Sequence, residues 1–292
     1  MLQCFEDSPE FAKQDRLPFK FKHRLMGHPA LSLENLGRVI PALPKDQVYY
    51  SSGLLSKSDD FDRAHIEHGN GLTIEQTIEN IRTSDSYIMV RSPEVDASFM
   101  PVFKELIGDV GALIRRQGVG DEVVNPKLYL FIASPNSLTP FHIDRYSTYL
   151  MQFRGSKEVK VFPPGDERVV TDVECENFMA HEGPRPTWKP DSDALGTSFH
   201  FAPGEALHIP FVAGHYVKNG ADDVSISMSI IFNTRETAHR IRALMFNQRM
   251  RPTMASLGVK PSSVGAHPSV DVIKSQTYRA ASWLARSLGK GE

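Results

Sequence analysis

Cysteine is nearly absent from this chain of 292 residues, which contains only Cys4 and Cys175. Two cysteines so far apart exclude both the disulfide framework of a small secreted domain and a cysteine-based zinc site. The sequence also lacks any run of about 18 apolar residues, so no membrane-spanning helix is expected. The first residues, MLQCFEDSPEFAKQDR, contain early acids and no apolar stretch, which argues against a secretory signal peptide. We therefore expect a soluble protein of the reducing cytoplasm.

Neither sign of charge dominates: 33 Lys and Arg face 35 Asp and Glu, and apolar residues make up 40% of the chain. This composition excludes a disordered, collagen-like or coiled-coil protein. Positive charge is concentrated in residues 235–292, which contain ten Lys and Arg against three acids. These cations could form solvated helix faces and contact the acidic remainder of the chain, or they could bind phosphates or acidic lipids. No zinc-finger spacing or helix-turn-helix pattern is present, so no motif that reads nucleic acid is expected.

Helical spacing of apolar residues marks the N-terminal part of the chain. A helix is expected over 31–40, ended by Pro41, and another over 73–82, where Thr73 and Gln76 have the spacing of a capping box. Residues 86–91 (SYIMVR) have the character of a strand, and a longer helix is expected over 99–117.

After residue 127 the pattern changes to short apolar runs separated by Pro, Gly, Asn and Asp. Strands are expected over 127–133, 149–153, 158–162, 198–201, 206–209 and 224–232. Many short strands at this density favour a closed or two-sheet β architecture such as a jelly roll. Helices return over 235–250 and 270–288. We therefore predict a mainly β fold with three segments: residues 1–80 packing on the core, a core over 81–234, and a C-terminal helical pair in 235–292.

His142 and Asp144 are separated by one residue, and in an extended segment such residues point to the same side. A third candidate ligand, His215, follows the predicted strand 206–209 and a turn that contains Pro and Gly. Two histidines and one carboxylate on one face would leave three positions free on Fe(II), as in the facial triad of non-haem iron oxygenases. The alternative is that these are ordinary polar loop residues; their joint position at the edges of the β core favours the metal.

Lys157 begins the predicted strand 157–162 and shares its face with two valines. If 2-oxoglutarate is the co-substrate, a buried ammonium here could bind its distal carboxylate, and the Thr139 hydroxyl could contribute a hydrogen bond. Alternatively, Lys157 could extend from the strand end into water. Serines alternate with apolar residues over 224–230, so one face of that strand would line either a wet cavity or solvent.

Four motifs, in order, carry a resemblance to a known family: 139–144 (TPFHID), 152–157 (QFRGSK), 161–166 (VFPPGD) and 203–215 (PGEALHIPFVAGH). Together they resemble the JmjC or cupin-like Fe(II)/2-oxoglutarate oxygenases. The resemblance covers roughly residues 80–235. It is greatest to the branch that contains the asparaginyl hydroxylase of the hypoxia pathway and many bacterial proteins labelled as transcriptional regulators. The resemblance implies a double-stranded β-helix (cupin) core.

By this resemblance, His142, Asp144 and His215 bind Fe(II), and 2-oxoglutarate and O₂ are co-substrates. The co-substrate site is implied to include five residues: Thr139, Lys157, Thr148 (where that branch often has an asparagine), Ser229 on the last core strand, and the pocket aromatic Tyr87. One departure is the segment 212–214 (VAG), where related enzymes often carry aromatic residues, so the metal would have more room on that side.

The implied activity is hydroxylation of a C–H bond, with 2-oxoglutarate decarboxylated to succinate. A protein or peptide side chain is the predicted substrate. The alternatives are a small-molecule metabolite and a non-catalytic, cupin-like regulatory module, against which the intact triad and Lys157 argue. A homodimer is also predicted, because the apolar stripes of the two C-terminal helices must be buried and relatives in this branch dimerise through such helices.

Overall fold

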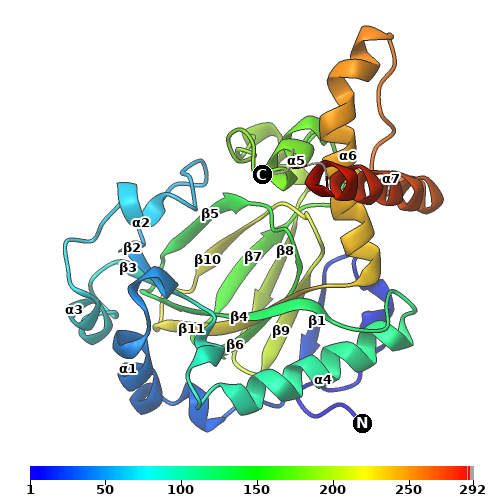
Figure 1. Cartoon of the computed structure of the whole chain (residues 1–292). Helices are drawn as coiled ribbons and strands as arrows, with labels where there is room; N and C mark the ends of the chain where they lie inside the picture. The colour runs from blue at the N-terminus through cyan, green and yellow to red at the C-terminus, as the bar shows by residue number, and fades with distance from the viewer. Residues whose placement is uncertain (288, 290–292) are drawn as a thin grey trace.

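A computed structural model describes residues 1–287 and 289, and it shows two antiparallel sheets facing each other (Figure 1). The larger sheet has the strand order β1-β9-β6-β11-β4-β3-β2 and the smaller one β5-β10-β7-β8. The strands of the larger sheet are Phe19–Lys22 (β1), Glu205–Ile209 (β9), Ser147–Arg154 (β6), Ser225–Asn233 (β11), Val124–Ala133 (β4), Ser86–Arg91 (β3) and Val48–Ser52 (β2). The strands of the smaller sheet are Leu138–His142 (β5), His215–Asn219 (β10), Lys157–Val161 (β7) and Thr197–Phe201 (β8).

The chain passes back and forth between the two sheets from β4 to β11, and only β7 and β8 are consecutive within one sheet. This topology is the jelly-roll or double-stranded β-helix core that was predicted, so the fold class is confirmed. The strands β1 and β2 come from residues 1–80 and extend the larger sheet at its two edges. The division of the chain at residues 80 and 234 remains a prediction.

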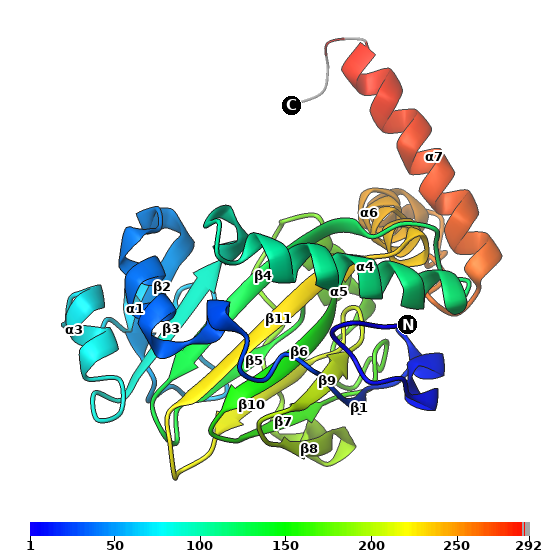
Figure 2. The same ribbon diagram turned by 90° about the horizontal axis from the view of Figure 1, so that it is seen from below.

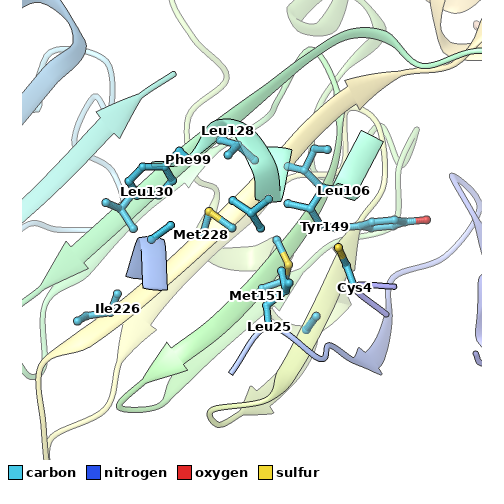
Figure 3. Packing of buried hydrophobic residues seen from close by; sticks show 14 of the residues in the cluster. Cys4, Leu25, Phe99, Leu106, Leu128, Leu130, Tyr149, Met151, Ile226 and Met228 are labelled. Carbon is cyan, nitrogen blue, oxygen red and sulfur yellow. The ribbon is translucent and has the colours of Figure 1, made fainter. Parts of the chain in front are cut away.

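Helix α4 (Met100–Arg116) covers the outer face of the larger sheet (Figure 2). Its apolar side includes Leu106 and Val110, which belong to the same buried cluster as Met228 of β11 and Tyr149 of β6. Figure 3 shows this packing, with Phe99 and Leu106 beside strand residues such as Leu128 and Met228. Burial of this face against a helix leaves the other face of the larger sheet to form the interior between the sheets.

Several predicted elements are confirmed. Helix α3 (Ile74–Glu79) begins with the predicted capping box between Thr73 and Gln76, and β3 and α4 lie where the apolar pattern placed them. Three helix ends are wrong: α3 ends at Glu79 instead of residue 82, α1 (Leu33–Ala42) includes Pro41, and α6 (Arg235–Ser256) includes Pro252. A proline removes one helical hydrogen bond, which a helix held by tertiary contacts tolerates. Arg251, next to Pro252, forms such a contact with the buried Glu176 of α5 (Asp172–Met179) at 2.6 Å.

The C-terminal helices make different contacts. The predicted apolar stripe of α6 is buried within the chain, because Leu244, Ile241 and Met245 pack against Phe178 of α5 and its neighbours. The expectation that this stripe contacts a partner is therefore wrong. Helix α7 (Pro268–Ser287) packs on α6 and extends away from the sheets (Figure 2). Leu288, which was predicted to end this helix, lies outside the described residues.

Short helices complete the described structure: α2 (Ala64–Glu67) and the 3₁₀ helices Pro9–Lys13, Pro29–Leu31, Lys45–Gln47, Pro93–Val95 and Pro190–Leu195. Within residues 1–287 and 289, no helix has both the length and the apolar character needed to cross a membrane.

Candidate metal centre

The structure brings together the three predicted metal ligands at one end of the smaller sheet. His142 is the last residue of β5 and His215 the first of β10, and the two residues are paired in the register of these strands. Their ring centroids are 4.1 Å apart, and His215 Nε2 lies 3.8 Å from Asp144 Oδ2. One ligand atom from each of the three residues lies within 4.8 Å of the others. Cross-strand pairing thus creates a cluster from residues 73 positions apart in the sequence.

The backbone fixes the orientation of both imidazoles. His142 Nδ1 lies 2.8 Å from the carbonyl oxygen of Pro140, and His215 Nδ1 lies 3.0 Å from that of Ala213. Each Nδ1–H can donate to its carbonyl, so each Nε2 keeps its lone pair for a metal. Burial, assisted by His215 and Arg185, lowers the pKa of His142 well below its ordinary value. Its neutral form, which is the metal-binding form, is therefore favoured, and the donor set fits Fe(II) or a similar divalent metal.

The turn before β10 positions His215. Val212 has a left-handed backbone conformation (φ 56°), and a Cβ at Gly214 would lie 2.7 Å from ring carbons of Phe141. Only glycine allows this close approach of β10 to Phe141 without a rearrangement. Small residues in the segment 212–214 therefore serve the packing of the turn.

The three clustered residues open onto a cavity of about 460 Å³ between the two sheets. All five other predicted site residues line the same cavity: Tyr87, Thr139, Thr148, Lys157 and Ser229. The structure thus brings together every residue predicted for the site. Their roles toward iron and 2-oxoglutarate are taken up below as proposals.

Lys157 is buried, with 5% of its surface exposed, and its ammonium faces the Phe131 ring at 6.0 Å. The described residues supply no carboxylate within ion-pair distance of it, and burial lowers its pKa to about 7. The suggestion that Lys157 extends into water is therefore wrong. Burial of an unpaired ammonium is costly, so this group either loses its proton, as its lowered pKa indicates, or requires an anion beside it.

The serine face of β11 also faces the interior. Ser225, Ser227 and Ser229 are at most 1% exposed, so the alternative of a solvent-exposed strand face is wrong. The hydroxyls of Thr148 and Ser227 are buried and find no hydrogen-bond partner among the described residues. Burial raises the pKa of the Tyr87 phenol, and the nearby Thr139 hydroxyl opposes this rise. Of Thr148 and Ser227, Thr148 lines the cavity, and its unsatisfied hydroxyl indicates a polar occupant or water there.

Several lining residues were not predicted. The Phe61 ring stacks on His142 with centroids 4.4 Å apart, and Arg185 pairs with Asp62. Arg145 directly follows the His-x-Asp motif and also lines the cavity. The position of Arg145 beside the motif was a usable signal. Phe61, Asp62 and Arg185 come from irregular segments whose contacts arise only in the folded chain, so no local pattern marks them.

No protein-family model matches the sequence, and a comparison with curated proteins finds no match. Among solved structures, that of Escherichia coli ycfD is similar in fold, with a TM-score of 0.54 and 15% identity. The match covers 96% of this chain and 68% of the ycfD chain. A second structure, described as the Escherichia coli ribosomal oxygenase YcfD, matches the same shares of the two chains, with a TM-score of 0.48 and 16% identity. The match to Bacillus subtilis oxalate decarboxylase covers 38% of this chain and 22% of the decarboxylase chain, with a TM-score of 0.27 and 17% identity. The first likeness establishes the fold, in agreement with the strand topology.

Proposed function

We propose that this protein is an Fe(II)- and 2-oxoglutarate-dependent oxygenase that hydroxylates a C–H bond of a protein or peptide side chain. One observation carries the proposal: a single cavity contains a two-histidine, one-carboxylate cluster and a buried lysine without an anionic partner. The first group of residues suits Fe(II), and the second suits the distal carboxylate of 2-oxoglutarate. The Escherichia coli protein of similar fold, ycfD, is named a ribosomal oxygenase, and that name supports a protein substrate. A cytoplasmic location is part of the proposal.

Each residue of the cavity would have a role set by its position. His142, Asp144 and His215 would hold the iron on one face, while Lys157 and Thr139 would hold the distal carboxylate of the co-substrate. Tyr87, Thr148 and Ser229 would contribute hydroxyls along its length. When bound, iron and 2-oxoglutarate supply the oxidising chemistry: O₂ is consumed, 2-oxoglutarate becomes succinate and CO₂, and one oxygen atom enters the substrate.

The apolar cluster between the sheets would limit access of water to this chemistry. Its members Leu150, Ile209 and Val217 line the cavity and are buried. The protein's part would therefore be to orient the substrate C–H bond toward the metal and to exclude other reductants.

One experiment distinguishes the proposed peptide hydroxylase from a small-molecule hydroxylase and from a non-catalytic module. The purified protein, supplied with Fe(II), ascorbate, 2-oxoglutarate and air, is incubated with a panel of peptides and a panel of metabolites. Mass spectrometry then detects a gain of one oxygen atom. Oxidation confined to peptides supports the proposal, and oxidation confined to metabolites favours a small-molecule hydroxylase. A protein that neither oxidises either panel nor forms succinate would be the non-catalytic module.

Binding of 2-oxoglutarate should depend on pH through Lys157. In the free protein burial lowers the pKa of this lysine to about 7, and a bound carboxylate favours the ammonium form. Above neutral pH, binding should therefore take up close to one proton, and affinity should fall by up to about tenfold per pH unit. Calorimetry in buffers of different ionisation enthalpy measures this uptake. Equal affinity across this range, or equal proton uptake by a Lys157→Gln variant, would contradict the assignment.

We also propose that α7 forms a homodimer contact. Ile273, Trp283 and Leu284 are 66, 62 and 51% exposed, whereas the residues of α7 buried toward the rest of the chain are polar: Asp271, Lys274 and Ser275. These three apolar residues of α7 thus face away from the chain, and a two-fold axis would let two copies cover each other.

Replacing both Trp283 and Leu284 with serine is expected to convert a dimer into a monomer, because the contact would lose its largest apolar groups. Size-exclusion chromatography with light scattering measures the mass. Ile66→Ser is the control, since Ile66 is 69% exposed on α2 and should leave the dimer intact. A wild-type chain that is monomeric at tens of micromolar would contradict the dimer.

A further inference from the structure

Two arginines lie together in the cavity beside the candidate metal centre. The guanidinium carbon of Arg145 is 3.8 Å from the centroid of the Phe178 ring, and that of Arg185 is 5.0 Å from the same centroid. Both side chains line the cavity that contains His142 and Asp144. A single aromatic ring therefore gathers two permanent positive charges at one place.

The donors of these arginines are only partly used. Arg145 donates from Nε and Nη2 to the carbonyl oxygen of Phe178, at 3.2 and 2.5 Å. Arg185 donates from Nε to Asp62, while its Nη1 is buried and has no hydrogen-bond partner among the described residues. Asp62 and Asp144 are the cavity carboxylates whose charges act on Arg145, and Asp144 would be a metal ligand in the loaded protein. Asp62 then faces two guanidinium groups, which leaves an excess positive charge and an unsatisfied donor. Such a donor is costly unless a ligand satisfies it.

This cationic pair is separate from Lys157. In the register of β7 and β10, Lys157 pairs with Asn219, whereas His215 pairs with Val161. Lys157 therefore lies four residues, or about 13 Å of backbone, deeper than the histidines. Arg145 lies beyond the ligands in the opposite direction, because it follows Asp144 after the end of β5. One anion at Lys157 cannot satisfy both positions.

We propose that Arg145 and Arg185 bind an anionic group of the peptide substrate, a carboxylate or a phosphate, next to the residue that is hydroxylated. This inference rests on the proposed function, since it names the class of peptide that the same cavity accepts. The planar fork of a guanidinium matches the oxygens of both anions, whereas two adjacent cations repel a basic peptide. Arg145 and Arg185 would thus determine specificity.

The test measures binding of four end-labelled pools of degenerate nonapeptides whose central residue is Glu, phosphoserine, Gln or Lys. Fluorescence anisotropy is recorded with Mn(II) and 2-oxoglutarate in the absence of O₂. The Glu or phosphoserine pool should bind about tenfold or more tightly than the Lys pool, and the better of these two identifies the anion. Arg185→Gln should remove most of this preference, Arg185→Lys should restore part of it, and Arg185→Glu should reverse it.

Two further variants make the result specific. Asp62→Asn should strengthen binding of the acidic pools, because it removes the competing carboxylate. Arg63→Gln is the matched control, since Arg63 is exposed, pairs with Glu67 and lies outside the cavity. Equal binding of all pools by the wild type, or a preference that Arg185→Gln leaves unchanged, would overturn the inference. Calorimetry of 2-oxoglutarate alone tests the proposed function separately, so failure of either one can be recognised.

Discussion

Replacing Asp144 with alanine should leave the purified protein nearly free of iron. The substitution removes the one carboxylate of the cluster and leaves two imidazoles, which do not form a facial triad. Loss of a residue that merely orients a ligand typically weakens metal binding by about 10- to 100-fold, so loss of a ligand should cost at least about 100-fold. Metal content per chain, measured by mass spectrometry after purification with Fe(II) under anaerobic conditions, gives the result.

A neighbouring carboxylate provides the control for this prediction. Asp62 lines the same cavity but pairs with Arg185, so Asp62→Asn should retain the wild-type iron content. Thermal unfolding of each apoprotein shows whether the fold is intact. Equal iron occupancy in the wild type and the folded Asp144→Ala protein would exclude the assignment of Asp144.

Replacing Lys157 with alanine should abolish binding of 2-oxoglutarate at ordinary concentrations while iron is retained. The distal carboxylate would lose its cation inside a cavity, a loss of about 2–5 kcal/mol, which corresponds to about 30- to several thousand-fold in affinity. Titration calorimetry of the metal-loaded protein measures the affinity, and metal analysis confirms that iron remains.

The same strand offers a matched control. Lys160 lies on the other face of β7 and pairs with Asp193 at 2.6 Å, so Lys160→Ala should bind 2-oxoglutarate normally. Arg154, three residues before Lys157 in the sequence, pairs with Asp223 at 2.9 Å and lies outside the cavity. Unchanged affinity in Lys157→Ala would therefore require a cation from the cavity itself, Arg91 being the next to test.

The sequence predicted the fold class and eight of the residues that line the cavity, and the reason is partly physical. Strands such as β11 alternate between serine and apolar residues, and the ligand cluster lies in short motifs whose order is set by the topology. The strands that carry the two histidines, β5 and β10, were nevertheless not recognised. Pro140 lies within β5, and β10 becomes a strand by pairing with β5 and β7, which is a long-range property.

Contacts between distant segments account for the other differences. Phe178 comes from α5, which was not predicted, and only the folded chain brings Arg145 and Arg185 to its ring. The apolar stripe of α6 indicated burial correctly but could not identify its partner, which is α5 and its neighbours in the same chain. Periodicity identifies the face that is buried, and tertiary packing decides what covers it.

Formation of succinate from 2-oxoglutarate is the measurement that tests the central claim most directly. Wild-type protein is incubated with Fe(II), ascorbate, labelled 2-oxoglutarate and O₂, and the labelled succinate is quantified beside the Asp144→Ala and Lys157→Ala proteins. We predict that the wild type forms succinate only when O₂ is present and that a peptide substrate increases the amount formed. Neither variant should form succinate above background. Absence of succinate from iron-loaded wild type with every peptide and metabolite, or equal succinate from all three proteins, would contradict the account.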